Sequence, residues 1–247
     1  MKEQFFEPQI SPCGDNALII TFGENINIKT QEKIMVFSDY LEKSPLPGMI
    51  EYIPGFTKIT ILYSPFSIYQ QYPEKNRQSP YQIFSELVYS SFYKIKGRPD
   101  LSRKTVTIPV CYDKRLGPDL EYVAKYNNLS IHEVIKLHSQ KEYLVYMLGF
   151  APGFPYLGGM DNRIAAPRKK TPQLKIPAGS VGIAGEQTGI YPIETPGGWQ
   201  IIGRTPLNLF EPLKQPPTLL KAGNLINFKP ISYSEYCDLT AARSEAK

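Results

Sequence analysis

The chain has 247 residues, more than one compact domain usually needs and enough for two domains of about 100–150 residues each. Its net charge of +5 is mild and its basic residues alternate with acids, so the sequence lacks the basic block of a nucleic-acid-binding arm. No apolar run approaches membrane-spanning length, and the charged N-terminus does not resemble a signal peptide. We therefore expect a cytoplasmic protein with neither a membrane nor a nucleic acid as partner.

The cysteines and histidines are few and scattered. Cys13, Cys111 and Cys237 form no CxxC pair, and only His132 and His138 accompany them. An odd cysteine count disfavours a secreted disulfide framework, and a zinc site would have to be assembled from distant positions. We expect no metal site.

The first hundred residues predict alternating strands and helices. Apolar runs of strand length lie at 17–22, 49–53 and 58–63. One helix is predicted from an N-cap at Thr30 to about Glu42, and a second from Ser79-Pro80, a favoured N-cap and N1 pair. This order, β-α-β-β-α, is that of a ferredoxin-like split βαβ unit, which needs one more strand to close.

A further predicted strand at 104–109 has two possible places. It either closes the first sheet or opens the second domain. The polar loop 96–100 is the best linker candidate because it combines Gly, Pro and charged residues. We therefore predict a first domain over 1–100 and a second over 101–247.

The second domain begins with two short predicted helices, one over 118–126 and one with a capping box at Ser130 and Glu133. Eleven prolines between 149 and 217 then leave no room for a helix of useful length. From residue 143 onward, short apolar runs are interrupted by Gly and Pro, and they lie at 143–148, 180–184, 199–202 and 225–228. Many short strands joined by turns predict a β-barrel or sandwich, so the chain as a whole is expected to be α+β. A short helix is predicted after 235.

The segment 149–159 is rich in Gly, Pro and aromatic residues. It lacks the Gly-Lys-Ser/Thr ending of a phosphate-binding loop, and Pro152 and Pro155 remove backbone donors. Either it is a rigid aromatic wall, in which Phe150, Phe154 and Tyr156 line a pocket, or it is a stiff loop that covers the end of a barrel.

The loop 166–175 concentrates cations between prolines. Arg168 is the strongest candidate for a bidentate contact with a carboxylate or phosphate. Lys169 and Lys170 fit a solvated loop.

Two further segments, 176–192 and 195–206, combine glycines with polar and aromatic residues. Gln187 and Thr188 lie beside glycines, where a tight turn can present an amide and a hydroxyl to a ligand. Barrel turns are the alternative. Trp199 fits a core position or a ligand platform, and Arg204 fits an anion clamp or a structural anchor.

His138 lies on the apolar face of its predicted helix, near the C-terminal end. A histidine there is either a packed residue with a satisfied hydrogen bond or a general acid/base.

Taken together, these segments resemble a known family. The matching motifs, in chain order, are PCGDNALIITFGE, VTIPVCYD, VIKLHSQKEYLVYMLGF, GFAPGFPYLGG, APRKKTP, IPAGSVGIAGEQTGIYP and TPGGWQIIGRTP. They are similar to the B subunit of bacterial 5-oxoprolinase, a family also called allophanate hydrolase subunit 1-like. The resemblance covers nearly the whole chain.

The resemblance implies an N-terminal ferredoxin-like domain and a C-terminal cyclophilin-like β-barrel. It implies a subunit that is inactive alone and works with subunits A and C to hydrolyse 5-oxo-L-proline to L-glutamate at the expense of ATP. The complex is expected to bind ATP together with Mg²⁺, and the resemblance does not say which subunit binds them. Two other functions are implied: inhibition of a sporulation sensor histidine kinase, and half of the carboxyltransferase module of a biotin-dependent urea carboxylase-like enzyme.

The predicted site rests on the residue types and their positions and on the resemblance to the family. Family members carry an Arg at the position of Gln173, and Lys175 is the candidate replacement. The predicted catalytic residues are His138, Arg168, Gln187, Thr188 and Arg204. The predicted substrate-binding residues are Phe150, Phe154, Tyr156, Lys175, Tyr191 and Trp199.

Overall fold

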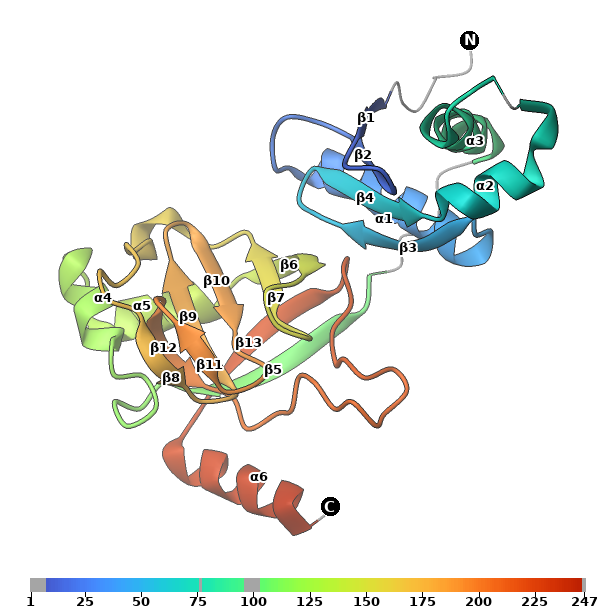
Figure 1. Ribbon diagram of the computed structural model, residues 1–247. Helices are drawn as coiled ribbons and strands as arrows, with labels where there is room; N and C mark the ends of the chain where they lie inside the picture. The colour runs from blue at the N-terminus through green and yellow to red at the C-terminus, as the bar shows by residue number, and fades with distance from the viewer. Residues whose placement is uncertain (1–7, 76, 96–102, 246–247) are drawn as a thin grey trace. The chain divides into compact units, whose positions relative to one another are not determined.

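The computed structural model describes residues 8–75, 77–95 and 103–245 (Figure 1). The chain divides into two compact units, Met1–Ser102 and Arg103–Lys247. The boundary that we predicted between residues 100 and 101 lies outside the described residues.

The first unit contains a four-stranded antiparallel sheet with the order β1-β2-β4-β3. Its strands are β1 (Gln9–Pro12), β2 (Ala17–Thr21), β3 (Met49–Pro54) and β4 (Lys58–Tyr63). Alternation along β4 buries Ile59, Ile61 and Tyr63, which together form one face of the strand as predicted.

The helices of this unit are α1 (Ile28–Lys43), α2 (Pro65–Gln71), the 3₁₀ helix η1 (Pro73–Lys75) and α3 (Pro80–Lys94). The predicted start of α3 is confirmed, with Ser79 at the N-cap in a reciprocal capping box with Gln82. The predicted N-cap at Thr30 is wrong. Asn27 caps α1 instead, because its side chain accepts a hydrogen bond from the Thr30 backbone N–H at 2.9 Å.

The predicted order of strand, helix, strand, strand and helix runs from β2 to α3, with α2 inserted. The position beside β2, which a ferredoxin-like unit gives to a closing strand after its second helix, is occupied by β1. Because β1 precedes the other elements, the strand at 104–109 is not needed to complete this sheet. The ferredoxin-like assignment itself stays a prediction.

The second unit is a closed seven-stranded barrel with the neighbour order β10-β7-β6-β13-β5-β12-β9. Its strands are β5 (Thr105–Cys111), β6 (Glu142–Leu148), β7 (Pro155–Gly158), β9 (Ser180–Ala184), β10 (Gln187–Ile190), β12 (Gln200–Arg204) and β13 (Leu225–Ile231). The predicted strand at 104–109 therefore opens the barrel, where β5 pairs in parallel with β13. A separate two-stranded sheet joins β8 (Gln173–Ile176) to β11 (Thr195–Gly197).

The helices of the second unit are α4 (Leu120–Tyr126), α5 (Ile131–Ser139), the 3₁₀ helix η2 (Asn162–Ile164) and α6 (Tyr233–Glu245). The capping box at Ser130 and Glu133 is confirmed. Helix α5 packs against β13 and η2, and α4 packs against β12. Within the described part of the chain, no helix has both the length and the apolar character needed to cross a membrane.

Candidate functional site

Strand β10 divides the predicted site residues between two faces of the barrel wall. Thr188 is fully buried and faces the interior. Its neighbours Gln187 and Gly189 face outward, because a Cβ on Gly189 would lie 3.0 Å from the ring of Phe154 outside the wall. Successive residues of a strand point to opposite faces. Gln187 and Thr188, which we predicted to act together, therefore lie on opposite sides of the sheet.

The inner side holds a closed hydrogen-bonded chain. The His138 ring is fully buried, with Nδ1 2.7 Å from the Tyr112 hydroxyl and Nε2 2.9 Å from Thr188 Oγ1. The Thr188 hydroxyl donates to the Gly182 carbonyl oxygen at 3.0 Å, so it accepts from His138 Nε2–H. Nδ1 then accepts from Tyr112. We assign the Nε2–H tautomer from this direction of donation.

Burial keeps the inner network uncharged. It lowers the pKa of His138 from 6.5 to about 3, since a charged ring would lose its hydration, and it raises the pKa of Tyr112 well above its usual value. Every polar atom of the His138 and Thr188 side chains has a protein partner. The geometry is therefore that of a structural network, and neither side chain is open to a substrate.

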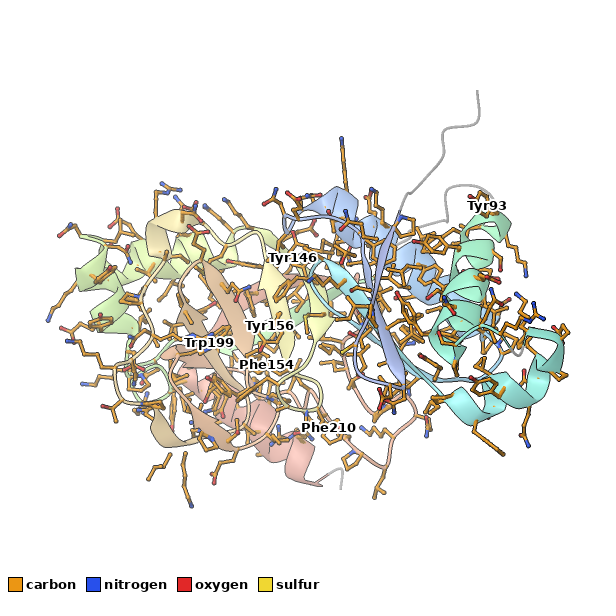
Figure 2. All side chains as sticks on the ribbon, turned by 45° about the horizontal axis from the view of Figure 1, so that its top comes forward. Tyr93, Tyr146, Phe154, Tyr156, Trp199 and Phe210 are labelled. Carbon is orange, nitrogen blue, oxygen red and sulfur yellow. The ribbon has the colours of Figure 1, made fainter. Side chains whose placement is uncertain are left out.

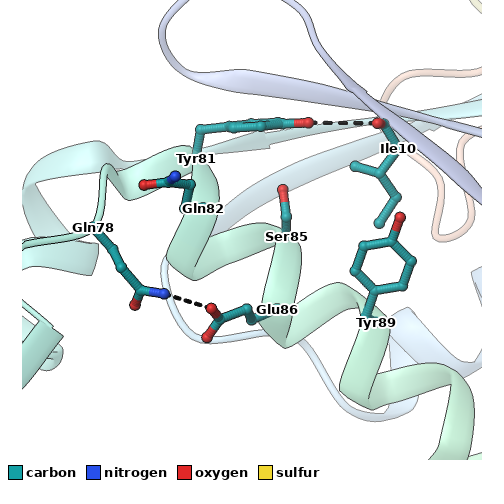
Figure 3. A pocket seen from close by; sticks show the side chains of 7 residues that line it. All are labelled: Ile10, Gln78, Tyr81, Gln82, Ser85, Glu86 and Tyr89. Atoms are coloured by element: carbon teal, nitrogen blue, oxygen red, sulfur yellow. Dashed lines mark hydrogen bonds between the residues drawn. The ribbon is translucent and has the colours of Figure 1, made fainter.

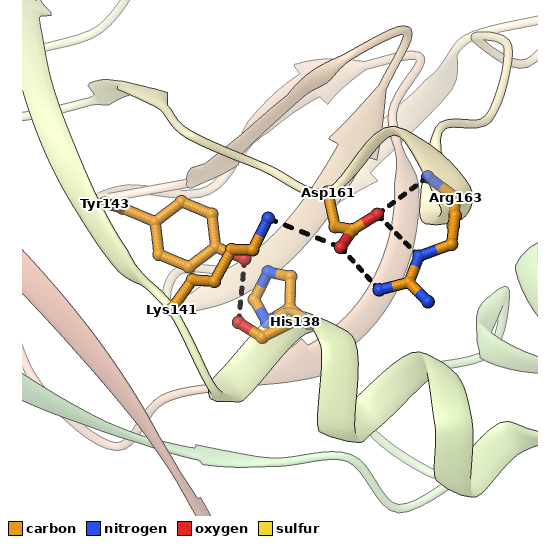
Figure 4. A network of polar contacts seen from close by, with 5 residues as sticks. All are labelled: His138, Lys141, Tyr143, Asp161 and Arg163. Atoms are coloured by element: carbon orange, nitrogen blue, oxygen red, sulfur yellow. Dashed lines mark hydrogen bonds and ion pairs between the residues drawn. The ribbon is translucent and has the colours of Figure 1, made fainter.

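A second set of polar contacts holds the end of α5 in place (Figure 4). The Tyr143 hydroxyl donates to the His138 backbone carbonyl at 2.8 Å. Asp161 accepts from Arg163, at 3.0 Å to Nε and 2.8 Å to Nη2, and pairs with Lys141 at 3.3 Å. These cations lower the pKa of the Asp161 carboxyl far below its usual range. The contacts fix the helix end that carries the histidine.

The outer side of the same wall carries an aromatic cluster. The centre of the Phe154 ring lies 5.3 Å from that of Tyr191 and 5.5 Å from that of Trp199, both at nearly perpendicular angles, and 5.1 Å from that of Tyr156. Figure 2 labels Phe154, Tyr156 and Trp199 in the barrel unit. Phe154, Tyr191 and Trp199 are almost completely buried, so they form a small core of their own rather than an open pocket wall. Burial raises the pKa of Tyr191 to about 12.

Phe150 is the exposed member of this group. Its ring is 65% exposed and makes edge contacts with Phe154 at 5.5 Å and Tyr191 at 6.5 Å. Its backbone has a φ of 70°, which bulky residues rarely adopt. Unusual backbone conformations of this kind cluster at ligand sites. Of the four aromatic residues that the sequence placed in the pocket wall or platform, Phe150 is therefore the one best placed to contact a ligand.

Arg168 lies beside the cluster on a loop that is fixed on both sides. The Pro167 carbonyl accepts from Gln200 Nε2 at 2.8 Å, and the Lys169 N–H donates to the Gly198 carbonyl at 2.7 Å. Within the described residues, nothing forms a hydrogen bond or ion pair with the Arg168 guanidinium, which is exposed and close enough to lower the pKa of Tyr191 by its charge. Its donors are available to a carboxylate or phosphate, so the anion contact predicted for Arg168 stays a prediction.

Lys169 differs from the prediction of a solvated side chain. Its ammonium group lies 2.7 Å from Asp119 Oδ2, and both side chains are more than four-fifths buried. The same Asp119 oxygen accepts the Ile201 backbone N–H at 2.7 Å. Asp119 was missed because its partners lie 50 and 82 residues further along the chain, and no local pattern marks such a contact.

The remaining candidates, Arg204 and Lys175, have no hydrogen bond or ion pair with Arg168 or Gln187 among the described residues. Arg204 is at the far end of β12, opposite Ser180 and Cys111 in the strand register, with its Nε buried and unpartnered among the described residues. Lys175 is exposed on β8 and 3.8 Å from Glu194. The predicted site residues thus divide into the inner network (His138 and Thr188), two further cations (Arg204 and Lys175) and a group on the outer face. We call that group the outer cluster: Phe150, Phe154, Tyr156, Arg168, Gln187, Tyr191 and Trp199.

Over residues 8–220 the chain matches the family described as "Carboxyltransferase domain, subdomain C and D". A solved structure, described as the crystal structure of TTHA0988, superimposes with a TM-score of 0.74 at 29% identity. That match covers 87% of this chain and 40% of the other chain. The chain thus belongs to the class of carboxyltransferase C and D domains, over a match that includes the first unit and most of the barrel unit.

Two relatives narrow this class. The chain is 52% identical over 228 residues to the B subunit of 5-oxoprolinase from Bacillus subtilis (strain 168), a match that covers 92% of this chain and 95% of the relative. It is 38% identical over 218 residues to the protein of the same name from Escherichia coli O157:H7, with 88% and 93% covered. The chain belongs to the family of 5-oxoprolinase B subunits, as its motifs indicated.

Proposed function

We propose that this chain is the B subunit of an ATP-dependent 5-oxoprolinase, which hydrolyses 5-oxo-L-proline to L-glutamate with subunits A and C, and that it is inactive alone. The observation that carries the proposal is the unpaired Arg168 on a fixed loop beside the aromatic cluster, in a chain 52% identical to the B subunit of a 5-oxoprolinase. The proposed substrate has one carboxylate and one lactam ring, which match a guanidinium and an aromatic surface.

The outer cluster supplies a role for each part of the substrate. Arg168 binds the carboxylate in a bidentate manner. Gln187 faces the same side, and none of the described residues is a hydrogen-bond partner of its amide, so it is free to pair with the lactam N–H and C=O. Phe150 covers the ring. His138 and Thr188 act as positioning residues, because they fix the strand that carries Gln187.

ATP and Mg²⁺ are assigned to the complex, where ATP supplies the free energy for opening an unstrained lactam. No residue of this chain is assigned to them. The segment 149–159 has prolines where a phosphate cradle needs N–H donors. Among the described residues, no group of three or more His, Cys, Asp or Glu is arranged to hold a metal ion.

Arg168→Ala tests the proposal in the complex reconstituted with subunits A and C. Loss of a charge-assisted contact of about 1.5–3 kcal/mol should lower kcat/KM by about 10- to 100-fold. The measurement is 5-oxoproline-dependent release of glutamate and ADP, and the chain alone should release neither.

Lys170→Ala is the matched control, because Lys170 is an exposed cation two residues away on the same loop. It should leave the rate within about twofold of wild type. Unchanged turnover in Arg168→Ala, with native Trp199 fluorescence, would remove Arg168 from the site.

The family description favours a second candidate function, a carboxyltransferase half-module that moves a carboxyl group from a biotin carrier. The test is transfer from carboxybiotin to urea by the same complex. Activity with urea and none with 5-oxoproline would replace the first proposal with the second. Inhibition of a sensor histidine kinase stays a prediction, testable with the lone chain in an autophosphorylation assay.

A further inference from the structure

The ion pair between Lys169 and Asp119 in the second unit differs from pairs at the protein surface. Lys169 Nζ lies 2.7 Å from Asp119 Oδ2, and the two side chains are only 18% and 16% exposed. In the first unit, Glu86 pairs with Lys75 and accepts from Gln78 at 2.6 Å beside a pocket (Figure 3), and the Lys75 and Glu86 side chains are 35% and 49% exposed. Exposed pairs contribute little, whereas a buried charge depends on its partner. Loss of the Lys169–Asp119 pair should therefore move the backbone around it.

Asp119 is fixed against strand β12 from the start of helix α4. Its backbone N–H donates to the Ile201 carbonyl at 2.9 Å, and its Oδ2 accepts the Ile201 N–H at 2.7 Å. Ile201 is buried in the same small core as Trp199. The carboxylate that binds Lys169 is thus held in place by contacts that do not involve Lys169.

One end of the loop that carries Arg168 is tied to the start of β10. Ala166 accepts the Gly185 N–H at 2.7 Å and donates its own N–H to the Gly185 carbonyl at 3.3 Å. Gly185 is two residues before Gln187, whose amide faces the outer side of the wall. These two hydrogen bonds fix where the loop begins relative to Gln187.

The other end of the loop depends on Lys169. Its backbone N–H donates to the Gly198 carbonyl at 2.7 Å, and its ammonium group binds Asp119. Lys170, the next residue, is exposed and has no hydrogen bond or ion pair within the described part of the chain. Arg168 directly precedes Lys169, so the two contacts of Lys169 limit how far the Arg168 backbone can move.

From these contacts we infer that Asp119 is a positioning residue for the carboxylate of the substrate, because it holds Arg168 in place through Lys169. This role rests on the function proposed above, in which Arg168 binds that carboxylate. Without Asp119, the Lys169 ammonium would turn to solvent to regain its hydration, and the end of the loop would be free to move. Arg168 would then have to be ordered when the substrate binds, which raises KM and leaves the later steps unchanged.

Asp119→Asn removes the charge and keeps an oxygen that can accept the Ile201 N–H. In the complex reconstituted with subunits A and C, kcat/KM for 5-oxoproline should fall about tenfold, mostly through a higher KM. Asp113→Asn is the matched control, because it also removes a carboxylate from an ion pair of the same unit, here with exposed Arg115 at 2.7 Å. The control should leave kcat/KM within about twofold of wild type.

A double-mutant cycle separates positioning from general damage to the barrel. If Asp119 acts through Arg168, Asp119→Asn should lower kcat/KM by less than about twofold when Arg168→Ala is already present. An equal loss in both backgrounds would overturn the inference. Asp119→Asn combined with Lys169→Met leaves no buried unpaired charge, so it replaces the single variant if that variant does not fold. It should show the same loss and the same dependence on Arg168.

Hydrogen exchange tests the loop without turnover. In the full-length chain, the Lys169 amide should exchange at least about tenfold faster in Asp119→Asn than in wild type, whereas the Gly185 amide at the other end of the loop should not change. Unchanged exchange at Lys169 would overturn the inference.

Turnover also separates the positioning role from the proposed function. If Arg168→Ala lowers kcat/KM and Asp119→Asn does not, the positioning role alone fails. If neither substitution changes kcat/KM, the proposed contact of Arg168 with the carboxylate fails as well.

Discussion

Polar side chains are hydrogen-bonded on the inner face of the barrel wall at β10 and, within the described part of the chain, unpaired on its outer face. On the inner face, His138, Thr188 and Tyr112 satisfy one another completely and are closed to solvent. On the outer face, Arg168 and Gln187 are held in position while their functional groups have no partner among the described residues. Polar groups whose hydrogen bonds are all made within the protein stabilise the fold, whereas polar groups without a partner, held on a fixed backbone, are available to a ligand. Changes on the inner face should therefore alter stability, and changes on the outer face should alter activity.

The largest effect is expected from His138→Ala. The change leaves a cavity in the barrel and removes the partners of Tyr112 and Thr188, so the free energy of unfolding should fall by about 3–5 kcal/mol. Trp199 is the only tryptophan, so its fluorescence during urea unfolding reports on the barrel unit. His132→Ala is the control, because His132 is exposed on the same helix and its loss should change stability by less than about 0.5 kcal/mol.

If His138→Ala unfolds at the same urea concentration as wild type, the inner network contributes no net stability. Loss of 5-oxoproline turnover in a fully stable variant would show that His138 acts through the position of Gln187 and not through stability.

The next effect is a pH dependence of the same network. The folded pKa of His138 is about 3 and the unfolded value is about 6.5, so the unfolded chain binds a proton that the folded chain does not. Stability must then fall as the pH decreases from 6.5 toward 3, by about 1.4 kcal/mol per unit. From pH 6.5 to 4.5 the expected loss is about 2.3 kcal/mol, because half of the unfolded chains already carry the proton at pH 6.5.

The histidine is separated from the carboxyls by comparing wild type with a variant that lacks it. Exposed glutamates with lowered pKa values, such as Glu121 and Glu133, begin to lose their stabilising contacts near pH 4.5 in both proteins alike. Asp113 and Asp161 have lowered pKa values, so the stability that they contribute is lost only below about pH 4. His138→Gln keeps a donor and an acceptor but cannot titrate in this range. Its stability, followed by Trp199 fluorescence, should therefore fall less steeply than that of wild type between pH 4.5 and 6.5. An equal slope in wild type and variant would assign the effect to another group.

Local sequence patterns predicted the helices and strands well, but they predicted poorly which face of a strand each side chain occupies. The capping box at Ser130 and the bounds of β9 follow from neighbouring residues, and the structure confirms both. The grouping of Gln187 with Thr188 ignored the two-residue repeat of a strand, which by itself places them on opposite faces. The Lys169–Asp119 pair and the edge position of β1 depend on distant parts of the chain, and no local signal encodes them.

The smallest effect concerns the backbone of Phe150. Phe150→Gly and Phe150→Ala both remove the ring, so both should reduce turnover of the complex by a similar factor. Only glycine accepts a φ of 70° without a Cβ clash, so Phe150→Gly should be more stable than Phe150→Ala by about 1 kcal/mol in urea unfolding. Equal stabilities would mean that the left-handed backbone at Phe150 costs nothing. In that case the exposure of the Phe150 ring would be the only feature that makes it available to a ligand, and backbone strain would play no part.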